Sequence, residues 1–398
     1  MSSQIEGSVT WSSTDGARVP TDQRVRRGLK RRTFWRIAPL VLLAIVLAFA
    51  SPVAADRDDG RKSFTVFTQN AYVGANLARV LEVDPTDEDF YDHLVEAVTT
   101  TYYELLASQP ALRMRGLADR IAARMPDVVA LQEMYLLRKQ SPGDLLKGGT
   151  APATEVVVDF LQSLMDGLAA RGLHYKVAAL TTETDVELPM QNMQTGVLED
   201  ARLTDRDLIL VRTDLPRDQF RVSNRQGGNF ESRLTLDTGL EVLQGWCSVD
   251  VFFRGEKFRF INTHLQDEAI PDLQFAQARE LMAEDGPTDT RLPVMLVGDF
   301  NADPFGRNGT ETYHSLIAGR FDDAWSALYP HKPGLTWGHD ALLADPSLRF
   351  VWRIDLVLFK GHLFAPKAMD TVDTGLRRFR APLWPSDHAG VWASFEIR

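Results

Sequence analysis

Short apolar runs, each followed at once by polar residues, recur along the chain from residue 64 onward. Runs rich in Val, Ile, Phe and Thr that are bounded by polar or turn-forming residues predict buried strands. Such runs lie at residues 64–68, 128–131, 174–180, 205–212, 294–297, 351–360 and 391–397. Residues 245–266 add a predicted hairpin whose two strands turn at Arg254 and Gly255.

Segments with a helical period lie between these strands. Residues 77–125 indicate helical structure, because Leu117, Ile121 and Met125 recur at every fourth position before Pro126. Further helices are predicted at residues 156–172 and 272–284, and loops at residues 139–155 and 181–200. Strands joined both by hairpins and by helices favour mixed sheets covered by helices, in one large domain.

An apolar run near the start of the chain predicts an export signal. Residues 1–30 are polar and lack periodicity, which is typical of disorder. The basic segment Lys30–Arg36 then precedes the apolar run Ile37–Ala50, which is short for a transmembrane helix and typical of a signal peptide. Val53 and Ala55 supply the small residues that a signal peptidase requires.

The segment Arg31–Phe34 resembles a twin-arginine export signal. We therefore predict that residues 1–55 form a disordered n-region and a signal peptide, and that a single domain spans residues 56–398. A signal anchor that stays uncleaved and an ordinary secretory signal with a long n-region are the alternatives. In each case the body of the protein is exported from the cytoplasm, and it is membrane-anchored if the signal is not cleaved.

Composition limits the classes of partner. The chain has 398 residues, 44% of them hydrophobic and 25% charged, so it can bury a large core. The segment up to Ala55 holds 8 basic and 3 acidic residues, which leaves 36 basic and 51 acidic residues and a net charge of −15 in the body. This balance disfavours tight binding of polyphosphates, although a local basic groove would still allow a nuclease. The single cysteine, Cys247, excludes an intrachain disulfide and a cysteine-based zinc site.

Candidate chemistry lies where the apolar runs end. Asn70, Glu133 and His264 follow three of the predicted strands, and Asp299 and Asn301 follow residues 294–297. Side chains alternate along a strand, so Asp299 and Asn301 are expected to point the same way. Their hard oxygen atoms suit a hydrated metal ion and a phosphate ester.

Three more polar residues fit this pattern. Asp355 lies within an apolar run, where an unpaired carboxylate is costly, so it requires a cation or a histidine partner. Asp387 and His388 precede the last strand. Each candidate also has an ordinary explanation, because Asp and Asn favour turns, a Glu at a strand end is commonly solvated, and a histidine is commonly a core residue. The repetition at strand ends instead favours convergence on one site.

The polar strand ends resemble the motifs of the endonuclease/exonuclease/phosphatase superfamily. The motifs stand in this chain as TQN, LQE, NTHLQ, GDFNADP, RIDLVL and SDH, in that order, and the resemblance covers residues 63–398. It implies an α/β fold in which two mixed sheets lie face to face with helices outside, a four-layer α-β-β-α sandwich. It also implies hydrolysis of a phosphoester with a divalent cation.

The resemblance implies a metal site. Glu133 matches the principal metal ligand of the superfamily, and Asn70 matches its neighbour, which also supports a phosphate oxygen. Asp387 belongs to the same cluster as a further metal or water ligand. Carboxylate and amide oxygens suit Mg²⁺, with Mn²⁺ or another divalent cation as an alternative.

The resemblance also implies roles for the other candidates. Asp299 matches the residue that orients or deprotonates the attacking water, and Asn301 matches the residue that holds a phosphoryl oxygen. His264 and His388 match the two histidines that stabilise developing charge or protonate the leaving oxygen, and Asp355 matches the carboxylate that orients His388. These groups suffice for direct attack of water without a covalent intermediate.

The substrate stays open at this stage. Export, the acidic body and the NTHLQ motif favour an extracellular phosphodiesterase that acts on lipid head groups or small phosphoesters, as a monomer with transient membrane contact. The sequence shows no evident amphipathic or aromatic hairpin for membrane insertion. An extracellular nuclease is the alternative enzyme, and a non-catalytic binding protein of the same fold is the third hypothesis.

Overall fold

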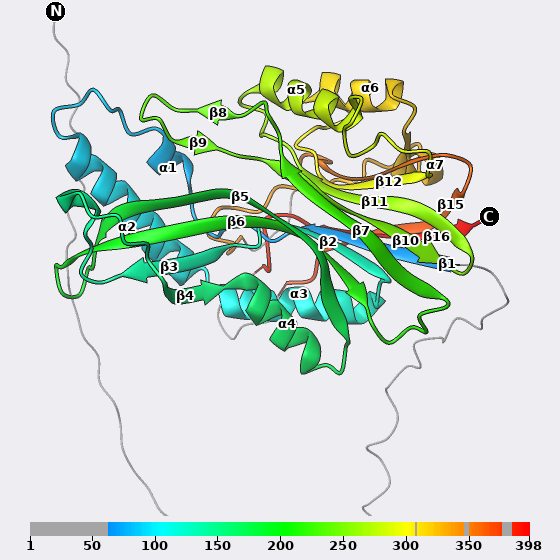
Figure 1. The fold of residues 1–398 in the computed structure, drawn as a ribbon, viewed down its shortest axis with the longest axis horizontal. Coiled ribbons are helices and arrows are strands. Elements are labelled where there is room, and N and C mark those ends of the chain that lie inside the picture. The colour runs from blue at the N-terminus through cyan, green and yellow to red at the C-terminus, as the bar shows by residue number, and fades with distance from the viewer. Residues whose placement is uncertain (1–62, 307–308, 346–349, 376–383) are drawn as a thin grey trace, which may run out of the picture. The chain divides into compact units, whose positions relative to one another are not determined.

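The computed structural model describes residues 63–306, 309–345, 350–375 and 384–398 (Figure 1). The predicted export signal in residues 1–55 lies outside these described residues. Within the described part of the chain, none of the helices combines the length and the apolar character needed to span a lipid bilayer.

The helices begin and end at residues that favour those positions. Helix α3 (Pro110–Arg124) has Pro110 in its first turn, where a missing N–H costs little, and it ends at Met125 in a left-handed conformation. Helix α4 (Phe160–Ala169) follows Asp159, whose carboxylate accepts hydrogen bonds from the N–H groups of the first turn. The other helices are α1 (Ala78–Leu81), α2 (Phe90–Ala107), η1 (Leu145–Lys147), α5 (Pro271–Met282), α6 (Thr310–Ala318) and α7 (Ala324–Leu328).

The first sheet is mixed. Its strands are β1 (Ser63–Asn70), β2 (Val128–Gln132), β3 (Leu136–Gln140), β4 (Glu155–Asp159), β5 (Tyr175–Gln191), β6 (Leu198–Arg212), β15 (Phe364–Val372) and β16 (Gly390–Ile397). Their order is β15-β16-β1-β2-β6-β3-β4, with β5 paired to β6. β1 runs parallel to β2 and antiparallel to β16.

The second sheet is also mixed. Its strands are β7 (Phe220–Asn229), β10 (Gly245–Phe253), β11 (Glu256–His264), β12 (Val294–Asp299), β13 (Asp322–Asp323) and β14 (Asp355–Lys360). Their order is β13-β14-β12-β11-β10-β7, and β11 and β12 are parallel. A separate short hairpin consists of β8 (Leu234–Thr235) and β9 (Glu241–Val242). The predicted β10–β11 hairpin is confirmed, because Arg254 and Gly255 both have the positive φ of a tight two-residue turn.

Alternate residues of the central strands face different layers. Val66 and Val128 of the first sheet pack in one buried cluster with Met295 and Val357 of the second. The intervening residues of the first sheet pack against α2, α3 and α4, and those of the second sheet pack against α5 and α6. The α3–α4 layer and the α5–α6 layer lie outside the two sheets in Figure 1. The predicted four-layer sandwich is therefore confirmed.

The prediction of a loop at residues 181–200 is wrong. β5 and β6 stay paired as far as Gln191 and Leu198, so most of this segment is a long two-stranded arm. The polar residues of the arm predict a loop, although Val186, Leu188 and Met190 lie two positions apart and are at least partly buried.

The predicted helix at residues 156–172 begins later than expected, at Phe160. Its first three positions are valines that continue β4 and pair with β3. Valine loses χ1 freedom in a helix and packs well on a sheet, so the sheet partner decides the structure of this segment.

Candidate active site

The register of the second sheet places three of the predicted residues side by side. β11, β12 and β14 are neighbours, and His264 is opposite Asp299, which is in turn opposite Asp355. In the first sheet, Asn70 is opposite Gln132, the residue before Glu133. Parallel strands end at the same edge of a sheet, so the four strand ends of the two packed sheets converge.

Asn70 joins the two sheets. Its Nδ2 donates to Oε1 of Glu133 and to Oδ2 of Asp299, at 2.9 Å in each case. The other carboxylate oxygen of Glu133 accepts from the backbone N–H of Val73 at 2.9 Å. Asn70 is buried, whereas Glu133 is only partly buried and lines the cavity described below.

The expectation that strand alternation aligns Asp299 and Asn301 is wrong. β12 ends at Asp299, and Asn301 has a left-handed φ of 49° in the turn that follows. Its backbone N–H donates to Oδ1 of Asp299 at 2.9 Å. The turn nevertheless brings the Asn301 amide to 3.5 Å from Nε2 of His264, and that amide donates to the Leu265 carbonyl. Asp299 and Asn301 therefore both belong to the site, but a turn, and not a continuous strand, places Asn301 there.

Gly298 allows Asp299 to reach its position. Gly298 has a φ of 141°, and a Cβ atom there would lie 1.9 Å from the carbonyl oxygen of Thr263 on β11. The close approach of β11 and β12 just before Asp299 therefore requires glycine.

His388 is held by the carboxylate that the sequence assigns to it. Its Nδ1 lies 2.9 Å from Oδ2 of Asp355, and its Nε2 lies 3.6 Å from Oδ2 of Asp299. Asp355 is the first residue of β14 rather than an interior position of a strand. Asp387 lies beside this pair, with Oδ1 3.8 Å from Nε2 of His388, and Trp337 donates to its other oxygen at 3.1 Å.

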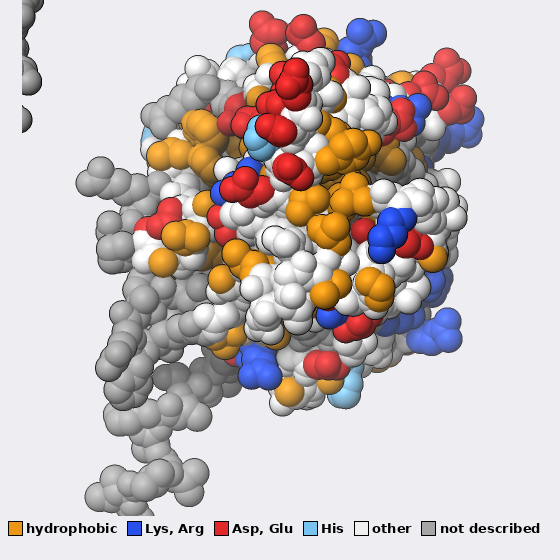
Figure 2. Space-filling view, turned by 90° about the vertical axis from the view of Figure 1, so that its left-hand side faces the viewer, with side chains coloured by type: hydrophobic (Ala, Val, Ile, Leu, Met, Phe, Trp, Pro, Cys, Tyr) orange, Lys and Arg blue, Asp and Glu red, His pale blue; other side chains and the backbone are white. Residues whose placement is uncertain are grey.

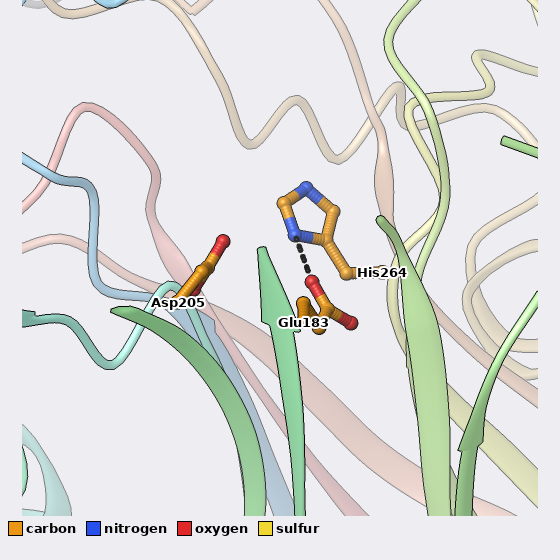
Figure 3. Close-up of side chains that lie close together, drawn as sticks. All are labelled: Glu183, Asp205 and His264. Atoms are coloured by element: carbon orange, nitrogen blue, oxygen red, sulfur yellow. Dashed lines mark ion pairs between the residues drawn. The ribbon is translucent and has the colours of Figure 1, made fainter. Parts of the chain in front are cut away.

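His264 lies beside a second carboxylate, which the sequence analysis did not identify. Figure 3 shows the Glu183 carboxylate below Nδ1 of His264, with Asp205 across the gap. The distance from Glu183 Oε2 to His264 Nδ1 is 3.9 Å, and Nε2 of the same ring is 3.8 Å from Oδ2 of Asp299. Each histidine of the site therefore has a carboxylate near Nδ1 and Asp299 near Nε2.

Burial and neighbouring charge set the protonation of these groups. Burial raises the pKa of Asp299 to about 7, although the charge of His388 opposes the shift. Burial lowers the pKa of His388, but the surrounding carboxylates, Asp355 above all, outweigh burial and hold that pKa well above its usual value. Burial lowers the pKa of His264. Asp299 is thus suited to accept a proton near neutral pH, and His388 to carry one.

The donor set fits a small divalent cation. Glu133 and Asp387 offer hard oxygen atoms of the kind that Mg²⁺ prefers. The predicted ligand Asn70 instead directs its Nδ2 to Glu133, because its Oδ1 accepts from the backbone N–H of Tyr72 at 2.8 Å. Burial raises the pKa of both carboxyl groups, and the charge of Asp387 raises that of Glu133 further. This part of the site therefore has an excess of negative charge that a cation would balance.

Among the described residues, two other groups have ligand atoms within 4.8 Å of one another. They are Glu183 with Asp205 and His264, and Asp299 with Asp355 and His388. Neither contains Glu133, Asn70 or Asp387. In the second group the short contact with Asp355 occupies Nδ1 of His388, and Nε2 of the same ring faces Asp299.

Two arginines of α3 fix the loops that carry the site. Arg113 and Arg120 are seven residues apart, so both project from the same face of the helix, and both are fully buried. Arg113 donates to the carbonyls of Ala71, Tyr72, Val73 and Pro385. Arg120 donates to Gln69 Oε1 and Asp373 Oδ1, and also to the His388 carbonyl. The loop after Asn70 and the loop before His388 are therefore held by one helix.

Sequence reasoning missed the acidic residues of β5 and β6. Glu183, Asp205 and Asp207 are buried in the described structure. Asp205 and Asp207 are two positions apart and directly precede the apolar run of β6, so strand alternation could have placed both on one face. Glu183 lacks such a signal, because the residues around it are mostly polar and predict a loop.

Most of the site groups border one cavity of about 820 Å³, whereas Asn70, Asp355 and Glu183 lie behind its lining. Glu133, His264, Asp299, Asp387 and His388 line one part of it, and many apolar side chains, together with some polar and acidic ones, line the rest. The volume lies within the usual range for ligand pockets.

Comparison with known proteins identifies a family. The protein-family profile described as "Endonuclease/Exonuclease/phosphatase family" matches residues 103–388. No curated protein matches the chain significantly.

Several solved structures resemble the fold. An endonuclease/exonuclease/phosphatase family protein from Leptotrichia buccalis is 14% identical, with a TM-score of 0.49, and the match covers 84% of this chain and 100% of that chain. An endonuclease/exonuclease/phosphatase from Beutenbergia cavernae is 19% identical, with a TM-score of 0.48 and coverage of 85% and 72%. A mannosyl-6-phosphatase from Bacteroides thetaiotaomicron is 18% identical, with a TM-score of 0.47 and coverage of 84% and 100%.

Proposed function

Because the chain belongs to the endonuclease/exonuclease/phosphatase family, whose members hydrolyse phosphoester bonds, we propose that it is a divalent-metal-dependent phosphodiesterase. The observation that carries the proposal is the convergence of Glu133, His264, Asp299 and His388 from both sheets on one cavity, with Asn70 linking Glu133 to Asp299. Carboxylate, amide and imidazole groups in this arrangement suit in-line attack of water on phosphorus.

The protein side chains account for the proton movements. Asp299 orients a water and accepts its proton as the water oxygen bonds to phosphorus. The bond from phosphorus to the leaving oxygen breaks, and His388, held by Asp355, gives that oxygen a proton. Asn301 and His264 hold a phosphoryl oxygen, and their mutual contact fixes the direction of both side chains.

Glu133 and Asp387 would hold the cation, and Asn70 fixes the Glu133 carboxylate through its Nδ2. When bound, a divalent ion such as Mg²⁺ supplies a Lewis acid that polarises a phosphoryl oxygen. Glu133 has the better access, because it is only partly buried and lines the cavity. Asp387 acts as a further ligand, directly or through water.

The acidic body and the export signal support a substrate outside the cytoplasm, either a lipid head group or a small phosphoester. Export rests on the sequence of residues 1–55 alone. Its test is a fusion of this segment to a reporter that is active only after export, with Arg31 and Arg32 replaced by lysine as the control for the twin-arginine route.

Hydrolysis is tested with bis-p-nitrophenyl phosphate and Mg²⁺. We expect the purified protein to release p-nitrophenol, to stop on addition of EDTA and to recover with excess Mg²⁺ or Mn²⁺. The Asp299→Asn variant, which keeps the size of the side chain, should be slower by about 10²–10⁴-fold. If wild type and variant are equally inert on diesters, monoesters, DNA and lipids, the protein is a binding protein of the same fold.

A further inference from the structure

The cavity of the active site extends beyond the catalytic groups into a region lined by apolar side chains. This region lies between α1, the β5–β6 arm and the β8–β9 hairpin. Val80 of α1, Leu188 of β5 and Leu203 of β6 are among its lining residues, and all three are only partly buried. Large apolar side chains therefore face open space beside a site built for phosphate chemistry.

The β8–β9 hairpin contributes most clearly to this surface. Leu234, Leu236, Leu240 and Val242 all line the cavity, whereas the intervening Thr235 is exposed. None of these four apolar side chains belongs to the hydrophobic cores formed by the described residues. These alternating side chains therefore line the cavity and do not contribute to the hydrophobic cores.

The hairpin is attached to the arm and is not a loose flap. The backbone N–H of Leu243 donates to Oγ1 of Thr184 on β5 at 2.8 Å, and the Thr184 hydroxyl donates to the Leu243 carbonyl at 3.2 Å. Phe230, at the base of the hairpin, donates to the Gln244 carbonyl at 2.9 Å. The apolar wall is thus built into the structure before any ligand arrives.

The charges around the cavity disfavour a polyanion. Among the described residues that line it, none is Lys or Arg, and Glu82, Asp267 and Glu268 add negative charge beyond the catalytic groups. A nucleic acid gains most of its affinity from Lys and Arg contacts to phosphates. On the face shown in Figure 2, hydrophobic side chains gather near the centre, and acidic side chains lie above them.

We propose that the apolar region binds the hydrocarbon chain of a lipid whose phosphodiester lies at the catalytic residues. The proposal rests on the proposed function and names the substrate class. A volume of about 820 Å³ accommodates a phosphate group together with a substantial length of chain. The occupant is therefore a phospholipid or a related amphiphile, with the polar ester at the strand ends and the chain against the hairpin.

A homologous substrate series tests this proposal. The substrates are p-nitrophenyl alkyl phosphates with methyl, butyl, octyl and dodecyl groups, used below their micellar concentrations with Mg²⁺. All four share one scissile bond, so only the chain varies. We expect kcat/KM to rise with chain length, by up to roughly fourfold per methylene while the chain is inside the cavity.

A matched pair of variants assigns the effect to the hairpin. Leu236→Gln places an amide against the chain, and we expect it to lower the ratio of dodecyl to methyl kcat/KM by at least about tenfold. Thr235→Gln adds the same amide at an exposed neighbouring position, and the ratio should stay at the wild-type value. Neither residue packs in a core, so both variants should keep the wild-type melting temperature.

Binding of dodecylphosphonate and methylphosphonate, measured by calorimetry, separates the two proposals. If no ester is hydrolysed but dodecylphosphonate binds much more tightly than methylphosphonate, the proposed catalytic function is wrong and binding of the hydrocarbon chain is supported. If the methyl ester is hydrolysed but neither rate nor binding depends on chain length, the lipid proposal is overturned. Hydrolysis of plasmid DNA together with a flat alkyl series would overturn it as well.

Discussion

Asp299 is the residue on which the other side chains of the site converge. Its Oδ2 accepts from Asn70 and lies within 4 Å of Nε2 of both His264 and His388. A carboxylate between two imidazoles lets one group accept a proton while another carries one. Asp355 contacts Nδ1 of His388, and Glu183 lies near Nδ1 of His264 at a longer distance.

At this scale we predict a severe effect of His388→Ala. Turnover of a diester with an alkyl leaving group, measured by release of the alcohol, should fall by about 10²–10⁴-fold, because the leaving oxygen loses its proton donor; bis-p-nitrophenyl phosphate, whose phenolate leaves readily, should slow less. The change in far-ultraviolet circular dichroism should be small, since the loop is held through the backbone carbonyl of residue 388. An unaltered rate would exclude the role assigned to this histidine.

Glu133→Gln should act mainly on the metal. The amide keeps the shape but loses the charge, so the Mg²⁺ concentration for half-maximal activity should rise at least about tenfold, while activity at saturating Mg²⁺ falls less. A Mg²⁺ titration of the initial rate measures both quantities. Equal Mg²⁺ requirements for wild type and variant would show that Glu133 does not bind the cation.

At the scale of elements, the sequence predicts the strands that are continuous apolar runs. It does not predict the strands whose structure depends on contacts with distant parts of the chain. The central strands β1, β2, β11 and β12 are predictable because they are buried on both faces and read as apolar runs. The β5–β6 arm has polar residues on one face and a partly open cavity on the other, so its alternation is weak. Glu183 was missed for this reason, and so was the apolar wall of the β8–β9 hairpin.

A buried ion pair connects the N-terminus of α7 to the segment directly before β14. Asp323 caps α7 and accepts from Arg353 at 2.7 Å, and both side chains are almost fully buried. Burial alone would raise the pKa of Asp323, but the bond from Arg353 outweighs burial and lowers it. Because the folded-state pKa is depressed, the stabilisation is complete above the unfolded pKa, near 4, and is lost as pH falls through the folded pKa.

The corresponding prediction concerns Asp323→Asn. The variant leaves a buried guanidinium uncompensated, so the free energy of unfolding at pH 7 should fall by about 3–5 kcal/mol. Urea unfolding followed by fluorescence measures this loss. The difference from wild type should shrink as pH falls towards 3, and a pH-independent difference would show that charge is not its cause.

At the scale of the whole molecule, the fold concentrates negative charge where the two sheets end. Asn70 and Glu133 come from the first sheet, and Asp299 and His264 come from the second, so the site exists only when both sheets are packed together. The apolar runs predict the sheets and the family resemblance predicts the convergence. Neither predicts the depth or the shape of the cavity, because its walls come from α1, the arm and the β8–β9 hairpin.

We therefore expect cation binding to stabilise the entire fold. Mg²⁺ at one hundred times its dissociation constant should raise the free energy of unfolding by about 2.7 kcal/mol, and EDTA should remove the gain. Thermal unfolding with and without Mg²⁺ measures the effect. Glu133→Gln is the matched control and should show a smaller shift at the same concentration, whereas equal shifts would place the stabilising ion elsewhere.

The two arginines of α3 have a consequence for how the protein opens. Arg113 binds carbonyls on both sides of the site, so the segments at residues 70–73 and 385–388 cannot detach independently. Local opening of either segment leaves buried hydrogen-bond donors of Arg113 without acceptors, which raises the cost of opening. In hydrogen exchange the amides of both segments should therefore exchange together with those of α3, as one cooperative unit slower than the β8–β9 hairpin.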